Sequence, residues 1–341
     1  VYDRNGRLVE TIYPDETPDE LSDNPTSRVE YDAAGRITAE VDELDNRIEF
    51  EYDITGDVVT RNALGNQATN KYDAARRLIA QIDALGRTVR FTYDEQGRVV
   101  EKQFPDGTRS VSEFDDRGRL ITRTDQEDNA TQFEFDDLTR LTAVVDAMGQ
   151  RTEYDYDESG NMILQIDANR HSTMFEYDGI GRLTSTVLPL GQRSTIAYDL
   201  VGNVQSKTDF NGETVTYEYD ARNRLEAKKY PDGNSVKYTY AATGQVETVT
   251  DARGVTSYEY DERGRLVSRT DPVSPSDPNG PRVSYTYDAA GNRTSVTTPS
   301  GTTAYTFDEL NRLKTVTDPE QSVLQYEYDE VGNLVEITLP N

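Results

Sequence analysis

Hydrophobic and polar residues alternate along this chain in short segments, each interrupted by Gly, Asp or Pro within about eight residues. Residues 98–104 form one such segment and residues 108–114 form the next. The segments are rich in Val, Thr, Tyr and Phe, and they are shorter than most helices. The pattern therefore predicts β-strands and no helices.

A seven-residue motif recurs along the whole chain: an aromatic residue, Asp, two variable residues, Gly, Arg and an aliphatic residue. Residues 177–183 (YDGIGRL) show it in full, and sixteen copies can be counted. From Tyr52 to Tyr240 the step between copies is 20 or 21 residues. A fixed period of this length indicates a repeat architecture. The residues assigned to the structural motif are Tyr52, Asp53, Gly56, Tyr93, Asp94, Gly97, Arg98, Tyr156, Asp157, Gly160, Tyr177, Asp178, Gly181, Arg182, Tyr198, Asp199, Gly202, Tyr219, Asp220, Tyr260, Asp261, Gly264, Arg265, Tyr287, Asp288, Gly291, Tyr328, Asp329 and Gly332.

Each repeat also contains a second turn signal, about ten residues after the first. Residues 83–86 read Asp-Ala-Leu-Gly and residues 146–149 read Asp-Ala-Met-Gly. Asp can bond its own backbone two residues on, and Gly takes the positive φ that closes such a turn. One repeat is thus predicted to be one β-hairpin, and sixteen hairpins make a long antiparallel sheet of more than thirty strands.

Alternation along each strand assigns the two faces of this sheet. Phe175 and Tyr177 share one face because they are two residues apart, and Glu176 points to the other face. Repetition predicts an aromatic ladder on one face and a stripe of carboxylates on the other. We interpret the stripe as the solvated face, with a ligand surface as the alternative. We also expect the motif Arg, such as Arg182, to reach the Asp of its own or a neighbouring motif.

Two Pro-rich stretches break the period, near residues 13–28 and 271–282. Because the motif resumes unchanged after each, we interpret both as longer hairpin loops and residues 1–341 as a single array. A β-propeller would show a double period, which is absent, and a parallel β-helix would not use turns that reverse the chain. A single antiparallel strip must curl as it lengthens, so a spiral or a partial shell is expected.

Composition agrees with a thin structure of this kind. Only 34% of residues are hydrophobic, against roughly 45–50% in a typical globular domain. The net charge of −27 disfavours nucleic-acid binding and indicates either a solvated acidic surface, which we favour, or a surface that holds a cationic partner. There is no Cys, and no apolar run approaches the roughly 18–20 residues that would span a bilayer.

Candidate chemistry is sparse, so we expect no enzyme, no catalytic residue, no cofactor and no metal site. His171 is the only His, and its neighbour Ser172 would face the opposite side of a strand. The acidic loops at residues 209–212 and 277–280 could hold Ca²⁺, but the same slot elsewhere takes Pro-Asp-Gly, which favours simple turns.

The repeated Tyr-Asp-x-x-Gly-Arg-Leu, followed by Asp-x-x-Gly, resembles the YD repeat of the Rhs (rearrangement hot spot) proteins. Similar repeats occur in the C component of Tc toxins, in bacterial wall-associated proteins and in teneurins. The resemblance covers the whole chain and implies a β-sheet that spirals into a hollow shell, which in the bacterial toxins encloses a C-terminal toxic domain. It further implies an exported or cell-surface protein whose partners are its own flanking repeats and a C-terminal toxin or effector domain.

This sequence departs from the complete family pattern. The self-cleaving core segment of the toxins has no match, because residues 318–321 (DPEQ) lack the Gly-Leu that follows in the family. A cap and a cargo domain are also absent, so we expect an internal segment of a longer polypeptide. The function expected is a structural shell segment. The alternative is an extracellular binding or adhesion module that recognises a glycan, protein or other cell-surface ligand through exposed Tyr and acidic residues, and buried tyrosines would favour the shell.

Overall fold

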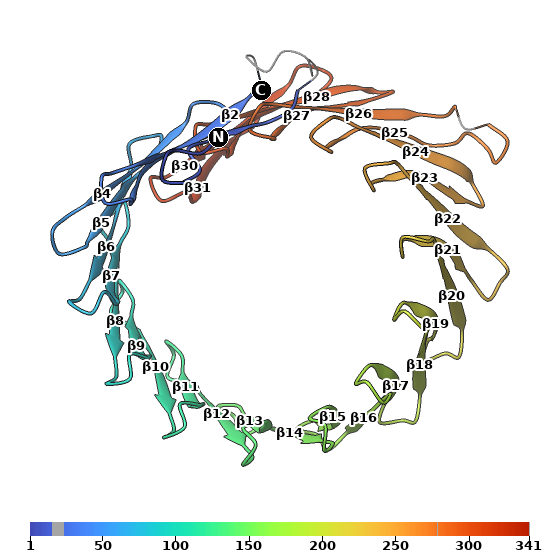
Figure 1. The fold of residues 1–341 in the computed structure, drawn as a ribbon, viewed down its shortest axis with the longest axis horizontal. Coiled ribbons are helices and arrows are strands. Elements are labelled where there is room, and N and C mark those ends of the chain that lie inside the picture. Colours follow the sequence, from blue (N-terminus) through green and yellow to red (C-terminus); the bar gives the residue numbers. More distant parts are fainter. Residues whose placement is uncertain (16–23, 278, 341) are drawn as a thin grey trace. The chain divides into compact units, whose positions relative to one another are not determined.

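The computed structural model describes residues 1–15, 24–277 and 279–340. Within these residues all regular structure is β: 31 strands belong to one open antiparallel sheet, and no helix is present (Figure 1). The predicted fold class, an all-β array of antiparallel hairpins, is confirmed. No helix in the described part of the chain is long and apolar enough to cross a membrane.

The chain divides into two compact units, residues 1–89 with 240–341 and residues 90–239, and the boundaries fall within β8 and β22. The strands up to β8 are β1 (Glu10–Ile12), β2 (Thr26–Tyr31), β3 (Ile37–Val41), β4 (Arg47–Tyr52), β5 (Val58–Arg61), β6 (Gln67–Tyr72), β7 (Leu78–Ile82) and β8 (Thr88–Tyr93). Those from β9 to β22 are β9 (Val99–Gln103), β10 (Arg109–Phe114), β11 (Leu120–Thr124), β12 (Ala130–Phe135), β13 (Leu141–Val145), β14 (Arg151–Tyr156), β15 (Met162–Ile166), β16 (Ser172–Tyr177), β17 (Leu183–Val187), β18 (Arg193–Tyr198), β19 (Val204–Thr208), β20 (Thr214–Tyr219), β21 (Leu225–Lys229) and β22 (Ser235–Tyr240). The remaining strands are β23 (Val246–Asp251), β24 (Gly254–Tyr260), β25 (Leu266–Thr270), β26 (Arg282–Tyr287), β27 (Arg293–Thr298), β28 (Gly301–Phe307), β29 (Leu313–Thr317), β30 (Val323–Tyr328) and β31 (Leu334–Thr338).

Within each unit, strands that follow one another in the chain pair antiparallel. The strands predicted at residues 98–104 and 108–114 are β9 and β10, with Ser110 opposite Lys102. We call the turn after each motif aromatic the motif turn and the other turn of the repeat the second turn. Motif turns lie along one side of the strip and second turns along the other, because the strands alternate in direction.

The 21-residue step contains one bulge residue beside the motif turn. Opposite β16, Tyr177 pairs with Leu183 and Glu176 with Ser185, so that Thr184 is the extra residue. Between β4 and β5 the bulge is missing, since Tyr52 pairs with Val58 and Glu51 with Val59. The step from Tyr52 to Tyr72 is accordingly 20 residues, one residue shorter.

Both breaks in the period lie between paired strands. β1 pairs with β2, with Glu10 opposite Arg28, although residues 16–23 of the loop predicted at 13–28 lie outside the described residues. β25 pairs with β26, with Thr270 opposite Arg282, and the loop predicted at 271–282 connects them; its residue 278 likewise lies outside the described residues.

The sheet has very little fully buried side-chain volume. In the described residues the buried hydrophobic side chains are Ala39, Val41, Ala80, Ala143, Val187 and Ala227. The aromatic side chains of the ladder are only half-buried, and the residue between each aromatic pair is exposed, as at Phe175, Glu176 and Tyr177. A one-layer sheet of this kind must be stabilised mostly by contacts between neighbouring repeats.

Candidate functional site

The motif turn is closed by hydrogen bonds to its Asp. The Asp178 N–H donates to the Arg182 carbonyl at 2.9 Å, and the Gly181 N–H donates to the Asp178 carbonyl at 3.0 Å. Asp178 Oδ1 accepts the N–H groups of Ile180 and Arg182 at 3.1 and 3.0 Å. Gly181 has a φ of +82°, which a residue with a Cβ adopts only with strain. The backbone N–H and the guanidinium of Arg182 hold the pKa of Asp178 below its ordinary value.

The motif Arg connects its own turn to the next repeat. Arg182 Nε donates to Asp178 Oδ2 at 2.7 Å, so of the two pairings expected, with the Asp of its own or of a neighbouring motif, the structure has the first. The same guanidinium lies 4.4 Å from the centre of the Tyr198 ring in the following repeat. This cation–π contact joins two repeats through one side chain. The same stacking joins Arg7 to Tyr31, Arg36 to Tyr52, Arg98 to Phe114, Arg119 to Phe135, Arg140 to Tyr156, Arg265 to Tyr287 and Arg312 to Tyr328.

The motif Tyr also bonds back to the preceding repeat. The Tyr198 hydroxyl donates to the Leu183 carbonyl at 2.8 Å. We call the set of motif Asp, motif Arg and the next motif aromatic the inter-repeat link. Equivalent hydroxyl bonds are made by Tyr31 to Leu8, Tyr52 to Ile37, Tyr156 to Leu141, Tyr177 to Met162, Tyr219 to Val204, Tyr287 to Leu266 and Tyr328 to Leu313.

Repeats with Asn in place of Arg keep part of this link. Asn161 Nδ2 donates to Asp157 Oδ2 at 2.8 Å, so the turn is closed in the same way. The Tyr177 hydroxyl still donates to the Met162 carbonyl at 2.9 Å. Only the stacked cation is lost. The other such Asp–Asn pairs are Asp199–Asn203, Asp288–Asn292 and Asp329–Asn333.

The carboxylate stripe carries a second set of bridges, which sequence reasoning missed. Glu176 on β16 accepts hydrogen bonds from both terminal nitrogens of Arg193 on β18, at 2.8 and 2.9 Å. The bridge passes over Ser185 on β17, which is 3% exposed. Two features of the sequence accompany such a bridge. A small residue stands two positions after the aliphatic residue of the motif, and Arg is the first residue of the next strand. The other bridges are Glu30–Arg47 over Ala39, Glu134–Arg151 over Ala143 and Glu259–Arg282 over Ser268.

Comparison with protein families identifies the repeat. The family model described as RHS Repeat matches residues 31–67, 72–109, 114–147, 135–173, 177–214, 198–235, 240–275, 273–303 and 307–341. The chain belongs to the RHS-repeat family. The resemblance inferred from the motif is therefore confirmed.

Solved structures show a similar fold at low sequence identity. The crystal structure of TcdB2-TccC3 without its hypervariable C-terminal region has a TM-score of 0.70 and 16% identity, and the similarity covers 99% of this chain and 23% of that one. TcdB2-TccC3 itself gives 0.69, and TcdB2-TccC3-TEV gives 0.66, with the same identity and coverage. This chain thus spans about a quarter of the length of the chains it matches. No curated protein matches the sequence.

The residues assigned to the RHS motif do not converge on one centre. The motif aromatics end their strands, as Tyr177 ends β16, and the Asp and Gly residues occupy the turns that follow. Each turn joins only its neighbours through the inter-repeat link. The arrangement is that of a repeated structural joint.

The described residues offer little for catalysis. No group of three or more His, Asp or Glu residues in residues 1–15, 24–277 and 279–340 is arranged to hold a metal ion. His171 Nδ1 lies 3.2 Å from Asp167 Oδ2 in an exposed second turn, where it takes the place of the Arg of other turns. In the loop at 209–212, Asp209 Oδ1 accepts the N–H groups of Asn211 and Glu213, which is turn geometry. Pro278 of the other acidic loop lies outside the described residues.

The RHS repeat that begins at Tyr52 lacks the motif Arg. Asp57 stands at that position, and Asp53, which is exposed, accepts the N–H groups of Thr55 and Asp57. Asp57 Oδ1 instead accepts the Tyr72 N–H at 2.8 Å. An open hollow of about 900 Å³, lined by Tyr52, Asp53 and Tyr72 among others, lies at the place of the missing guanidinium.

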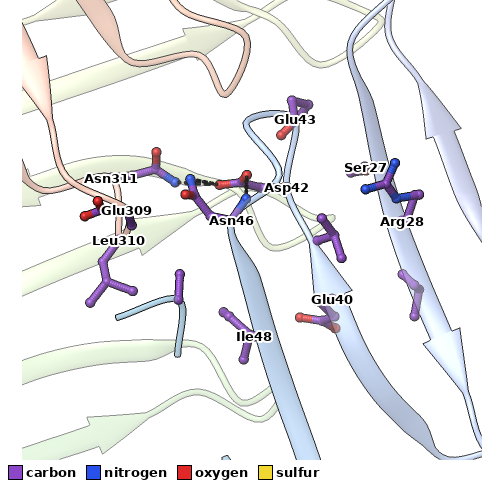
Figure 2. A pocket seen from close by; sticks show the side chains of 13 residues that line it. Ser27, Arg28, Glu40, Asp42, Glu43, Asn46, Ile48, Glu309, Leu310 and Asn311 are labelled. Carbon is purple, nitrogen blue, oxygen red and sulfur yellow. Dashed lines mark hydrogen bonds between the residues drawn. The ribbon is translucent and has the colours of Figure 1, made fainter. Parts of the chain in front are cut away.

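Within the unit that contains residues 1–89 and 240–341, RHS repeats far apart in sequence also meet. Figure 2 shows the motif turn at Glu309–Asn311 beside the second turn that contains Asp42, and Asn311 Nδ2 donates to Asp42 Oδ2 at 3.3 Å. A cavity of about 370 Å³ between them is lined by Leu310, Ile48 and Glu40 among others. One motif-turn side and one second-turn side therefore form a contact.

Proposed function

We propose that this chain is a structural wall segment of a longer RHS-repeat protein, which encloses or presents a C-terminal toxin or effector domain. The observation that supports this most strongly is the inter-repeat link, repeated from turn to turn along a single sheet. A complete link consists of an Asp–Arg pair and an Arg stacked on an aromatic ring, as in Arg182 over Tyr198 at 4.4 Å, and in other repeats Asn replaces the Arg and keeps the bond to the Asp. Such contacts hold neighbouring hairpins together and support a structural role.

The structural relatives support the same proposal. TcdB2-TccC3 shares the fold over 99% of this chain, and one solved form is described as lacking a hypervariable C-terminal region. A chain that corresponds to 23% of that structure would need flanking repeats to enclose anything. We therefore propose that residues 1–341 act as one array, as a non-enzymatic part of an exported protein. Its partners would be its own flanking repeats and its C-terminal domain.

The exposure of tyrosine argues against the adhesion alternative. In the described residues Tyr2 and Tyr230 are the only exposed tyrosines, at 69% and 39%. The motif tyrosines are half-buried, and many donate their hydroxyl to a backbone carbonyl, as Tyr198 does. A surface that recognises ligands through Tyr would leave these rings accessible.

Protease protection tests the proposed function. The complete polypeptide would be treated with a protease, and cleavage of its C-terminal domain compared with cleavage of the same domain expressed alone. We expect the domain to be cleaved at least about tenfold more slowly in the complete polypeptide, because the wall excludes the protease. Equal cleavage rates would exclude enclosure.

A further inference from the structure

We propose that the third residue of each motif turn, two positions after the Asp, is the contact position between RHS repeats that are not adjacent in sequence. We call it the tip residue. We further propose that the tip residues of residues 117–222 accept the second-turn side of flanking RHS repeats of the same polypeptide. This inference rests on the proposed function, since it requires those flanking repeats.

The first observation is a covered tip at Arg263. Its side chain is 15% exposed and lies 3.4 Å from Glu43, whose side chain is 12% exposed. Its guanidinium also lies 4.5 Å from the centre of the Tyr13 ring. The three residues come from repeats at opposite ends of the chain. The contact uses an acidic second turn and a cationic tip.

The second observation is a covered tip at Leu310. Its side chain lines the cavity in Figure 2, together with Val29, Val41 and Ile48 of the N-terminal repeats. The preceding residue, Glu309, is exposed, whereas Leu310 is half-buried. Glu309 and Asn311 also line this cavity, and Leu310 supplies the apolar part of the contact from this turn. In this contact an apolar tip packs against apolar residues at the ends of strands that flank a second turn.

The tip side chain is not part of the inter-repeat link, which uses the aromatic, the Asp and the Arg of each motif. The turn uses the backbone N–H of the tip, and the Arg tips also donate to a backbone carbonyl of the next motif turn, Arg117 to Asp137 and Arg263 to Ala289. The Leu310 and Arg263 N–H groups, for example, donate to Asp308 and Asp261 at 2.9 and 3.0 Å. Because the tip side chain is not part of the link, it can differ from repeat to repeat. Its polarity can therefore match that of the surface it contacts.

All seven tips of residues 90–239 are exposed, and five of them are Arg or aliphatic, like the two covered tips, whereas the others are Gln96 and Ser159. Leu138, Ile180 and Val201 are 69%, 77% and 71% exposed. Arg117 and Arg222 are the tips at the two ends of the row on residues 117–222, and both are exposed. The order along successive turns is Arg117, Leu138, Ser159, Ile180, Val201 and Arg222. Exposed aliphatic residues gathered along one side of a soluble protein are typical of an interaction surface.

The covered tips indicate what fits this row. Both meet the second-turn side of RHS repeats, with an acidic residue for the Arg tip and apolar strand ends for the Leu tip. The row on residues 117–222 offers three aliphatic tips and Ser159 between two Arg tips, which complements the same kind of surface.

Cysteine labelling tests this in a chain that has no Cys of its own. Leu138→Cys and, one residue before it in the same turn, Asp137→Cys would be reacted with a maleimide under native conditions. In the complete polypeptide we expect the Leu138→Cys thiol to react at least about tenfold more slowly than in the 341-residue chain, while the Asp137→Cys rate stays within about twofold. Equal reactivity of the two variants in the complete polypeptide would overturn the proposal.

The covered turn provides the internal reference. In the 341-residue chain, Leu310→Cys should react several-fold more slowly than Glu309→Cys, because Leu310 faces the cavity of Figure 2. If it does not, the contact from which the proposal is drawn is absent and the proposal falls. Slow labelling of Leu138→Cys in the isolated chain that disappears on dilution would assign the surface to a second copy and also overturn it.

Failure of this inference and failure of the proposed function give different results. If the tip thiols of the complete polypeptide react rapidly and its C-terminal domain resists the protease, the shell function is supported and this contact is excluded. If the tip thiols react slowly but the C-terminal domain is cleaved as fast as the domain alone, the contact is supported and enclosure is excluded.

Discussion

The motif turn at Asp178 and the second turn at Asp83 are built from the same bonds. In each, Asp Oδ1 accepts two backbone N–H groups, and the Arg four residues on donates Nε to Oδ2, at 2.7 Å for Arg182 and 2.6 Å for Arg87. They differ in what lies beyond the turn. Arg182 also covers the Tyr198 ring, whereas Arg87 has no stacked ring within the described residues.

This difference shows that turn formation and cohesion between repeats have separate causes. The Asp and the Gly close a turn on either side of the strip. The aromatic residue that precedes the motif Asp supplies the ring for the preceding Arg, and the second turn at Asp83 follows Ile82 instead. The two sides therefore have similar turns, and we expect neighbouring repeats to be held together more strongly on the motif-turn side.

Acidification should have the largest effect, because it acts on both sides together. The backbone N–H and guanidinium of Arg182 lower the pKa of Asp178; at Asp83 burial opposes the shift and the bonds from Arg87 outweigh it. A carboxylate whose pKa is lower in the folded than in the unfolded state contributes stability at pH values above its unfolded pKa. That contribution is lost as the pH falls through the folded pKa. We expect Tm by circular dichroism to be flat from pH 7 to about 5 and to fall by roughly 10 °C below about pH 4. A Tm that stays level to pH 2.5 would contradict the role of these carboxylates.

Removal of one ring should distinguish the sides most clearly. Tyr198→Ala removes the surface on which Arg182 stacks and the hydroxyl bond to Leu183, so we expect about 2–3 kcal/mol of destabilisation by urea denaturation. Tyr230→Ala is the matched control, because Tyr230 belongs to a second turn and is 39% exposed. It should cost less than about 1 kcal/mol. Similar losses from both variants would remove the distinction between the sides.

Removal of the cation alone should have a smaller effect. Arg182→Ala should lower stability by about 0.5–1 kcal/mol more than Arg87→Ala, since both lose an Asp pair and only the first loses a stacked ring. A double-mutant cycle with Tyr198→Leu would isolate the coupling. Equal effects of the two Arg variants, with no coupling, would exclude the link through the ring.

The smallest expected effect is a gain. Asp57→Arg would restore the missing motif Arg, placing a guanidinium beside Asp53 and the Tyr72 ring in the open hollow. We expect Tm to rise by about 1 °C. Asp57→Asn is the control, because Asn occupies this position in other repeats without a stacked cation, and it should gain less. A decrease with Arg would show that the hollow does not correspond to the guanidinium position.

Contacts within one hairpin could be predicted from the sequence because their spacing is short and fixed. The strands, both turns and the Arg182–Asp178 pair follow from local rules for Asp, Gly and alternating side chains. The aromatic ladder follows in the same way, with Phe175 and Tyr177 half-buried and Glu176 exposed.

Contacts between strands and between distant repeats could not be predicted. The stacking of Arg182 on Tyr198 depends on the register of two further strands, and the Glu176–Arg193 bridge depends on a small residue lying between them. The pair formed by Glu43 and Arg263 is 220 residues apart in sequence. Its position depends on the twist added by every intervening strand, and small differences in twist accumulate over that length.

Because the inter-repeat link joins only neighbouring hairpins, it bears on how the number of repeats can change in the gene. Each link joins one hairpin only to the next, through residues that most repeats encode. An in-frame duplication of one repeat in the gene would therefore add a hairpin that carries both halves of its own joints. The length of the strip can change by copying, and the new material needs no compensating change elsewhere in the gene.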